Sequence, residues 1–136
     1  MVVRVLLVLC VLMSVHASAE AKPTELIMVC RGDISAIGDV TWDRENEVIA
    51  AHVKNDKISL SGNLFFRSQN IRICPSGTDN LSDDERLFDT DGCGQTKNGD
   101  PRTYGIYNEI LRTLTVTRTD NKINTTVMGH FKCETQ

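Results

Sequence analysis

Six carboxylates crowd into one short stretch of the chain, between Asp79 and Asp91, and carboxylate oxygens are the ligands that Ca²⁺ prefers. Within it, Asp89-Thr90-Asp91-Gly92 resembles part of a calcium-binding loop, where alternate acidic residues and a glycine turn surround the cation. The EF-hand pattern also needs a glutamate six residues beyond the glycine, and position 98 is Asn. The sequence therefore favours a solvated acidic loop. The alternative, a weak extracellular calcium site, rests on the carboxylates of Asp83, Asp84, Asp89 and Asp91.

Hydrolytic chemistry has two candidate bases in the mature chain, His52 and His130. A Ser–His–Asp triad does not require its members to be close in sequence. However, the chain has no Gly-x-Ser-x-Gly nucleophile motif. The sequence thus predicts no catalytic residue, and a small hydrolase that uses one of these histidines is an alternative to a binding role.

The first 19 residues have the features of a cleavable signal peptide. Arg4 precedes an apolar run from Val5 to Val15, and small residues precede possible cleavage sites after Ala19 and after Ala21. The apolar run has about eleven residues, whereas a membrane-spanning helix needs about 20. We therefore expect residues 1–19 to be removed and the product to be secreted or periplasmic, without a membrane anchor.

The mature chain, Glu20 to Gln136, has the length of a single domain. Removal of Arg4 with the signal leaves 14 basic side chains against 18 acidic ones. This balance gives no electrostatic reason to bind nucleic acid or an anionic membrane.

Four cysteines remain once Cys10 is removed with the signal peptide, and an even number behind an export signal predicts two disulfides. No two of them form a Cys-x-x-Cys pair, which argues against a metal site. Three pairings are open. We favour Cys30–Cys133, which joins two strand-like runs near the two ends of the domain, together with Cys74–Cys93, which closes one irregular loop.

Short runs of alternating or continuous apolar residues predict about seven β-strands and no long helix. The C-terminal part, Tyr104 to Cys133, has the pattern of a β-meander. The expected fold is all-β, a small antiparallel sandwich or partly closed barrel with two disulfides. Its expected inward-facing residues include Ile58, Leu60, Leu64, Phe66, Ile71, Ile73, Leu114, Val116, Ile123, Val127 and Phe131. We expect these side chains to fill the interior.

Residues 76–103 show no periodicity, and so long a connection in a compact domain is usually functional or mobile. Ser82 followed by Glu85 fits a capping box, which suggests one helical turn at the start of the run Asp83 to Phe88. The sequence predicts a binding module that acts through this loop on a protein or small-molecule partner, and it specifies neither that partner nor an oligomeric state.

The chain resembles a group of small exported bacterial β-rich proteins of unknown function. The matching pieces are Val29-Cys30-Arg31-Gly32, Gly105-Ile106-Tyr107-Asn108, Leu114-Thr115-Val116 and Phe131-Lys132-Cys133. The chain departs from the pattern at Ile110-Leu111-Arg112, where the group has a Thr-Gly turn. The resemblance implies a β architecture and the Cys30–Cys133 pairing, and it implies no site residue.

Two N-glycosylation acceptor patterns begin at Asn80 and Asn124. They matter only for a eukaryotic source, and the resemblance to bacterial proteins makes both chance matches.

Overall fold

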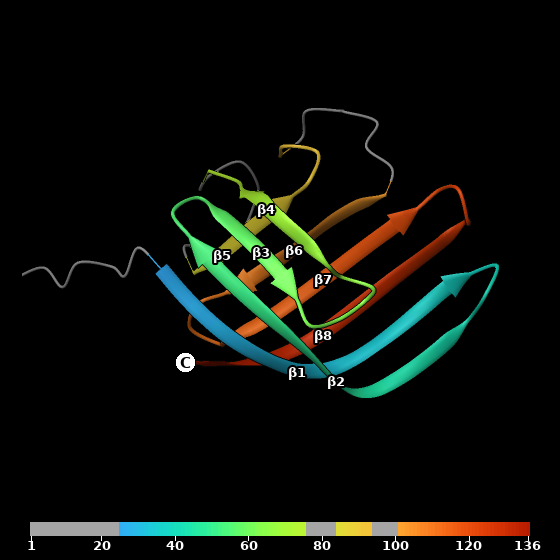
Figure 1. The fold of residues 1–136 in the computed structure, drawn as a ribbon, viewed down its shortest axis with the longest axis horizontal. Helices are drawn as coiled ribbons and strands as arrows, with labels where there is room; N and C mark the ends of the chain where they lie inside the picture. Colours follow the sequence, from blue (N-terminus) through green and yellow to red (C-terminus); the bar gives the residue numbers. More distant parts are fainter. Residues whose placement is uncertain (1–24, 76–83, 94–100) are drawn as a thin grey trace, which may run out of the picture.

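The computed structural model describes residues 25–75, 84–93 and 101–136. These residues form eight antiparallel strands, each paired with the next along the chain, and the last strand pairs with the first to close a barrel (Figure 1). The strands are β1 (Glu25–Gly38), β2 (Trp42–Lys54), β3 (Lys57–Ser61), β4 (Ser68–Ile73), β5 (Glu85–Asp89), β6 (Arg102–Asn108), β7 (Thr113–Asp120) and β8 (Thr125–Thr135). The predicted all-β antiparallel fold is confirmed, with eight strands and a fully closed sheet.

The two longest strands, β1 and β2, form a curved hairpin that extends at the same end of the barrel as the β7–β8 hairpin (Figure 1). The two hairpin tips are hydrogen bonded to each other. The backbone N–H of Asp39 donates to the carbonyl oxygen of Asn124 at 3.3 Å, and the Asn124 side-chain amide donates to the Asp39 carboxylate at 3.0 Å. The ends of β1 and β8 are thus fixed together where the chain folds back.

Alternate side chains of every strand point into the barrel and fill its middle, as expected from the period of two in a β-strand. The largest of the buried side chains are Phe66, Phe88, Met28, Ile34, Ile49, Ile58, Leu60, Ile71, Leu114 and Val116. Two inward positions are glycines because aromatic rings occupy the space of a side chain. A Cβ at Gly105 would overlap the backbone carbonyl of Thr115 as well as the ring of Phe88, and one at Gly129 would overlap the rings of Phe66 and Phe131.

Most of the predicted inward residues are buried, Ile73 is partly buried, and two are exposed. Leu64 is 88% exposed and Ile123 is 59% exposed. In the sequence, both continue the apolar–polar alternation of a neighbouring strand. In the structure, however, β3 ends at Ser61 and β8 begins at Thr125. The two side chains therefore lie in connections, where the parity of the strand no longer applies.

The interval 76–103 is not irregular throughout, because it contains β5 and the first residues of β6. Glu85–Asp89 pairs with β6, from Glu85 opposite Asn108 to Asp89 opposite Tyr104. The suggested helical turn at Asp83 to Phe88 is therefore wrong for residues 85–88. Phe88 is fully buried in the barrel, so tertiary packing outweighs the local capping signal here.

Both predicted disulfides are present. Cys30–Cys133 joins directly opposed residues of β1 and β8, and both cysteines are buried in the core. Cys74–Cys93 joins the residue that follows β4 to the turn that follows β5. Two disulfides indicate that the folded chain belongs in an oxidising compartment.

The expected signal peptide, residues 1–19, lies outside the described residues. Within the described ranges, no helix has the length and apolar character needed to cross a membrane.

Candidate functional site

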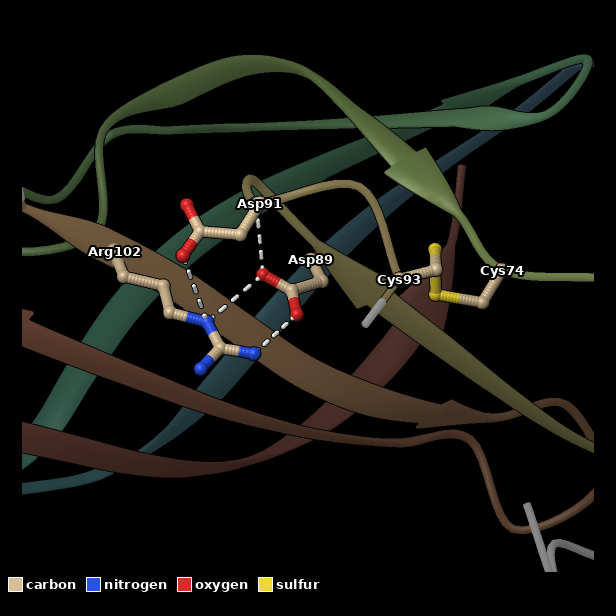
Figure 2. The surroundings of a disulfide bond; sticks show 5 residues. All are labelled: Cys74, Asp89, Asp91, Cys93 and Arg102. Carbon is tan, nitrogen blue, oxygen red and sulfur yellow. Dashed lines mark hydrogen bonds and ion pairs between the residues drawn. A yellow bond between two sulfur atoms is a disulfide. The ribbon is translucent and has the colours of Figure 1, made fainter. Parts of the chain in front are cut away.

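The acidic turn after β5 is organised around one arginine, as Figure 2 shows. The Arg102 guanidinium, on β6, donates through Nε to Oδ1 of Asp89 at 3.1 Å and through Nη2 to Oδ2 of the same carboxylate. Its Nε also lies 3.5 Å from Oδ2 of Asp91. The hydrogen bond to Asp89 is the main reason that the pKa of Arg102 is raised above its usual value.

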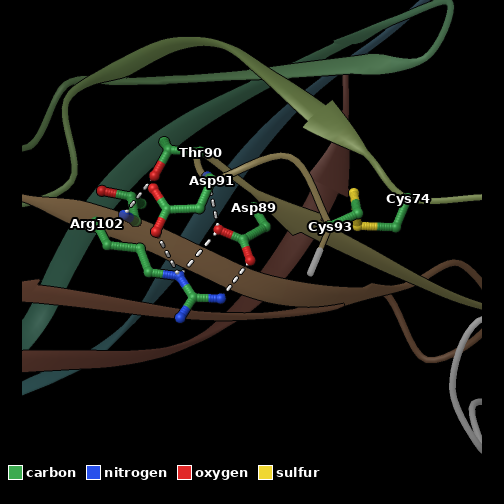
Figure 3. A network of polar contacts seen from close by, with 7 residues as sticks. Cys74, Asp89, Thr90, Asp91, Cys93 and Arg102 are labelled. Atoms are coloured by element: carbon green, nitrogen blue, oxygen red, sulfur yellow. Dashed lines mark hydrogen bonds and ion pairs between the residues drawn. A yellow bond between two sulfur atoms is a disulfide. The ribbon is translucent and has the colours of Figure 1, made fainter. Parts of the chain in front are cut away.

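The backbone of the same turn is held by hydrogen bonds on both sides (Figure 3). The Asp89 carboxylate accepts from the N–H of Asp91 at 2.9 Å, and the Asp89 carbonyl accepts from the N–H of Gly92 at 3.2 Å. Thr90 donates its N–H to the carbonyl of Thr103 and accepts from the N–H of Thr103 through Oγ1. The turn is therefore tied to the start of β6 independently of any ligand.

The structure places only some of the candidate calcium ligands together. Asp89 and Asp91 are adjacent but both contact Arg102, whose positive charge already balances them in part. Asp84 accepts the N–H of Glu109 at its backbone carbonyl, and Asp83 lies outside the described residues. In the part of the chain that the structure describes, no three His, Cys, Asp or Glu side chains are grouped to hold a metal ion. The calcium site stays a prediction.

The two histidines lie on the outside of the barrel. His52 Nε2 is 2.7 Å from Oε1 of Glu25, and both side chains are about half exposed. His130 Nδ1 is 3.3 Å from the hydroxyl of Thr115. Neither imidazole lines a described pocket, and the hydrolase alternative gains no support from their positions.

Asn124 lies in the exposed turn between β7 and β8, whereas Asn80 lies outside the described residues. The side-chain amide of Asn124 is engaged with Asp39. This contact does not test whether Asn124 is glycosylated.

A pocket of about 540 Å³ lies at the end of the barrel where β1 begins and β8 ends. Its deepest side chains are Ile58, Phe88 and Tyr107, all of which are buried. Leu26, Val53 and Ile73 are partly buried and complete its apolar surface, because each is the last inward-facing position of its strand before the barrel ends. Closed barrels are filled in the middle, and this one leaves space for a ligand at one mouth.

Polar side chains form the rim of this pocket: Arg86, Glu109, Arg112, Asn55 and Thr135. Arg86 Nε lies 3.4 Å from Oε1 of Glu109, and both side chains are partly buried. Burial, and then the negative charge of Glu109, raise the pKa of the Tyr107 phenol, while Arg112 opposes the shift. The phenol therefore stays protonated, and able to donate a hydrogen bond, at neutral pH.

Sequence reasoning missed this pocket because its charged residues occupy inward-facing positions. Arg86 follows the same parity as buried Phe88, and Glu109 the same parity as buried Tyr107. Alternation alone assigns charged residues to the solvent-facing side of a strand. The sequence does contain one signal of the pocket. Arg86 and Glu109 stand at positions where the alternation of their strands calls for an inward-facing apolar residue.

The opposite mouth differs in size and contents. Its pocket is about 170 Å³ and is lined in part by Leu64, Phe65 and Ile123. Nearby, the rings of Trp42 and Phe65 are 4.6 Å apart, and the Arg44 guanidinium lies 5.2 Å from each ring centre. This end is closed by side chains that pack on each other, and the larger pocket is the better candidate site.

No protein-family model, curated protein or solved structure matches this chain.

Proposed function

We propose that the protein is an exported binding module that takes a small amphipathic molecule into the larger pocket. The main support for this proposal is a pocket of about 540 Å³ with a buried apolar floor and a charged rim. Sites for small molecules typically measure about 300–1,000 Å³ and combine apolar walls with a few polar groups. The apolar floor supplies the affinity, and the rim fixes the orientation of the ligand.

The export part of this proposal rests on three observations of different kinds. Residues 1–19 have the pattern of a cleavable signal peptide. The two disulfides are typical of an oxidising compartment such as the periplasm or the extracellular space. The resemblance to small exported bacterial proteins points the same way.

The sequence directed attention to residues 76–103, and that interval contributes to the proposed site. Arg86 and Phe88 line the pocket from β5, which lies within it. The acidic turn follows the C-terminal end of β5 and is bonded to Arg102, and none of its residues lines the pocket. We therefore place binding at the barrel mouth, with the acidic turn as a support of β5.

A neutral fluorescent probe, N-phenyl-1-naphthylamine, tests for binding in this pocket. We expect saturable binding to the mature protein with a rise in fluorescence. Val53→Trp adds a large side chain at the pocket wall, and we expect it to weaken probe binding at least about tenfold. Val48→Trp is the matched control, because it makes the same substitution on the same strand but on the outside of the barrel.

Equal affinity of the probe for the wild-type protein and Val53→Trp would show that it binds elsewhere. Circular dichroism and thermal melting of both variants establish that the barrel is folded. Absence of saturable binding to the wild-type protein would overturn the proposed function.

A further inference from the structure

The rim of the larger pocket has an uncompensated positive charge among its described lining residues. Its charged members are Arg86, Glu109 and Arg112. Arg86 and Glu109 form an ion pair, so their charges largely cancel at the rim. Arg112 then leaves the described lining with a net charge of about +1 at neutral pH.

The backbone of Arg112 is fixed in an unusual conformation. Its φ is +51°, in the left-handed region that residues other than glycine rarely adopt. Its carbonyl oxygen accepts the N–H of Cys133 at 2.8 Å, which anchors it beside the disulfide of the β1–β8 pair. Non-glycine residues held in this region cluster at functional positions, where the surrounding structure maintains them.

The turn that precedes Arg112 is held in the same way. The Asn108 carboxamide oxygen accepts the N–H of Leu111 at 2.8 Å, and the N–H of Glu109 donates to the carbonyl of Asp84 at 2.8 Å. The point from which the Arg112 side chain extends over the pocket is therefore set by the fold. Such preorganisation lowers the entropic cost of binding a ligand.

The donors of the Arg112 guanidinium are not used by the fold. Within the described ranges, the side chain makes no hydrogen bond and no ion pair, in contrast to Arg86 and Arg102. A guanidinium has five N–H donors in a planar fork that matches a carboxylate, a sulfonate or a phosphate. Its position at the rim puts these donors over a pocket whose floor is apolar.

We propose that the ligand is an amphipathic anion, with its apolar body against Ile58, Ile73 and Phe88 and its anionic head group on Arg112. This inference rests on the proposed function and names the chemical class of its ligand. Tyr107 also lines the pocket, and its buried phenol supplies a neutral hydrogen-bond donor to the same head group.

A pair of competitors that differ only at the head group tests the inference. Decanoate and 1-decanol have chains of equal length, and decanoate is ionised at pH 7.5. We measure how each displaces N-phenyl-1-naphthylamine from the mature protein. We expect decanoate to displace the probe from the wild-type protein at a concentration at least about fivefold lower than from Arg112→Asn. We expect 1-decanol to displace the probe equally well from both proteins. Raising the salt concentration should weaken decanoate alone, because screening acts on the charged head group.

Asparagine is the chosen replacement because it removes the charge and still tolerates the left-handed backbone. Arg31→Asn is the matched control. It removes the same charge from an exposed outward position of β1 that does not line the pocket, so it reproduces any change in long-range electrostatics. We expect it to leave both competitors unchanged.

Three outcomes separate this inference from the proposed function. A loss of decanoate competition confined to Arg112→Asn supports the anion. Unchanged decanoate competition in Arg112→Asn, with the probe still bound, overturns the anion but leaves the pocket as a binding site. Failure of the probe to bind the wild-type protein overturns the proposed function, and the inference with it.

Discussion

The contact between β1 and β8 and the contact between β4 and β5 close the barrel in different ways. β1 pairs with β8 continuously, from Met28 opposite Thr135 to Gly38 opposite Thr125. In the described part of the chain, β4 pairs with β5 only through Arg72 opposite Asp89 and Ile73 opposite Phe88. Each contact has one disulfide, so the cross-links are alike while the backbone pairing beneath them is not.

The two disulfides therefore have different tasks. Cys30–Cys133 adds to a long ladder that already joins the two ends of the chain. Cys74–Cys93 lies just beyond a very short ladder and replaces the hydrogen bonds that the ladder lacks. The ion pairs of Arg102 with Asp89 and Asp91 add to it, because they hold the turn after β5 against β6.

The proposed pocket lies beside the short ladder. Ile73 comes from β4, while Arg86 and Phe88 come from β5. Regions that open to admit ligands are drawn from the less stable parts of a structure. We infer that the β4–β5 contact sets how readily the pocket changes shape, and that the Cys74–Cys93 disulfide limits that change.

Removal of the Cys30–Cys133 disulfide should cause the greatest loss of global stability among the changes considered below. The double substitution Cys30→Ala and Cys133→Ala opens a loop with a sequence separation of 103 residues. The chain-entropy relation gives about 4.7 kcal/mol for a loop of that size, and the two buried sulfur atoms leave a cavity that adds to the loss. Urea unfolding followed by circular dichroism measures the change in the free energy of unfolding.

Thiol counting by mass spectrometry is the control, since the Cys74–Cys93 disulfide has to remain intact in this variant. A loss of less than about 1 kcal/mol would show that the long ladder alone closes the barrel. The expectation that this disulfide contributes more to global stability than Cys74–Cys93 would then be wrong.

A smaller and more local effect is expected for Cys74→Ala with Cys93→Ala. These cysteines are 19 residues apart, and a loop of that size corresponds to about 3 kcal/mol in the chain-entropy relation. Because the ladder beneath is short, we expect much of the loss to appear as local opening. Hydrogen exchange should accelerate at the N–H of residue 74, which in the wild-type protein donates to the carbonyl of Leu87 on β5.

The matching amides between β1 and β8 serve as the internal control in the same experiment. We expect their exchange to change only as much as the global stability does. Uniform acceleration over the whole barrel would contradict a local task for this disulfide.

The fold could be predicted from the sequence wherever alternation and cysteine spacing act together. The inward row Leu114, Val116, Val127 and Phe131 and both disulfides are confirmed. Each of these features is local, or is limited to three possible pairings. Strand ends were harder, as Ile123 shows, because an apolar residue in a turn continues the pattern of the strand beside it.

The candidate site could not be predicted in the same way. Strand β5 has only five residues, and the Asp- and Gly-rich segments around it have the composition of a loop. The pocket depends on Arg86, Glu109 and Arg112 meeting at one mouth, which follows only from the closure of the barrel. The carboxylates of the acidic turn were evident from the sequence, but their arginine partner, Arg102, comes from the next strand.

The titration of the Tyr107 phenol reports on the short β4–β5 ladder, and we expect it to show the least change. Burial raises the pKa of its phenol above the usual value of about 10. A raised folded-state pKa stabilises the fold fully below pH 10, and this contribution is lost as the pH rises through the folded-state pKa. In a Tyr104→Phe background, Tyr107 is the single tyrosine of the mature chain, so its ultraviolet absorbance follows it alone.

We expect the apparent pKa of Tyr107 to fall toward about 10 when Cys74 and Cys93 are both replaced by Ala, because β5 then separates more easily from β4 and exposes the phenol. Replacing Cys30 and Cys133 instead should shift it less at equal temperature, since the long ladder stays paired. Equal titration midpoints in the two double variants would show that the pocket end responds to global stability alone, and the β4–β5 contact would lose its separate task.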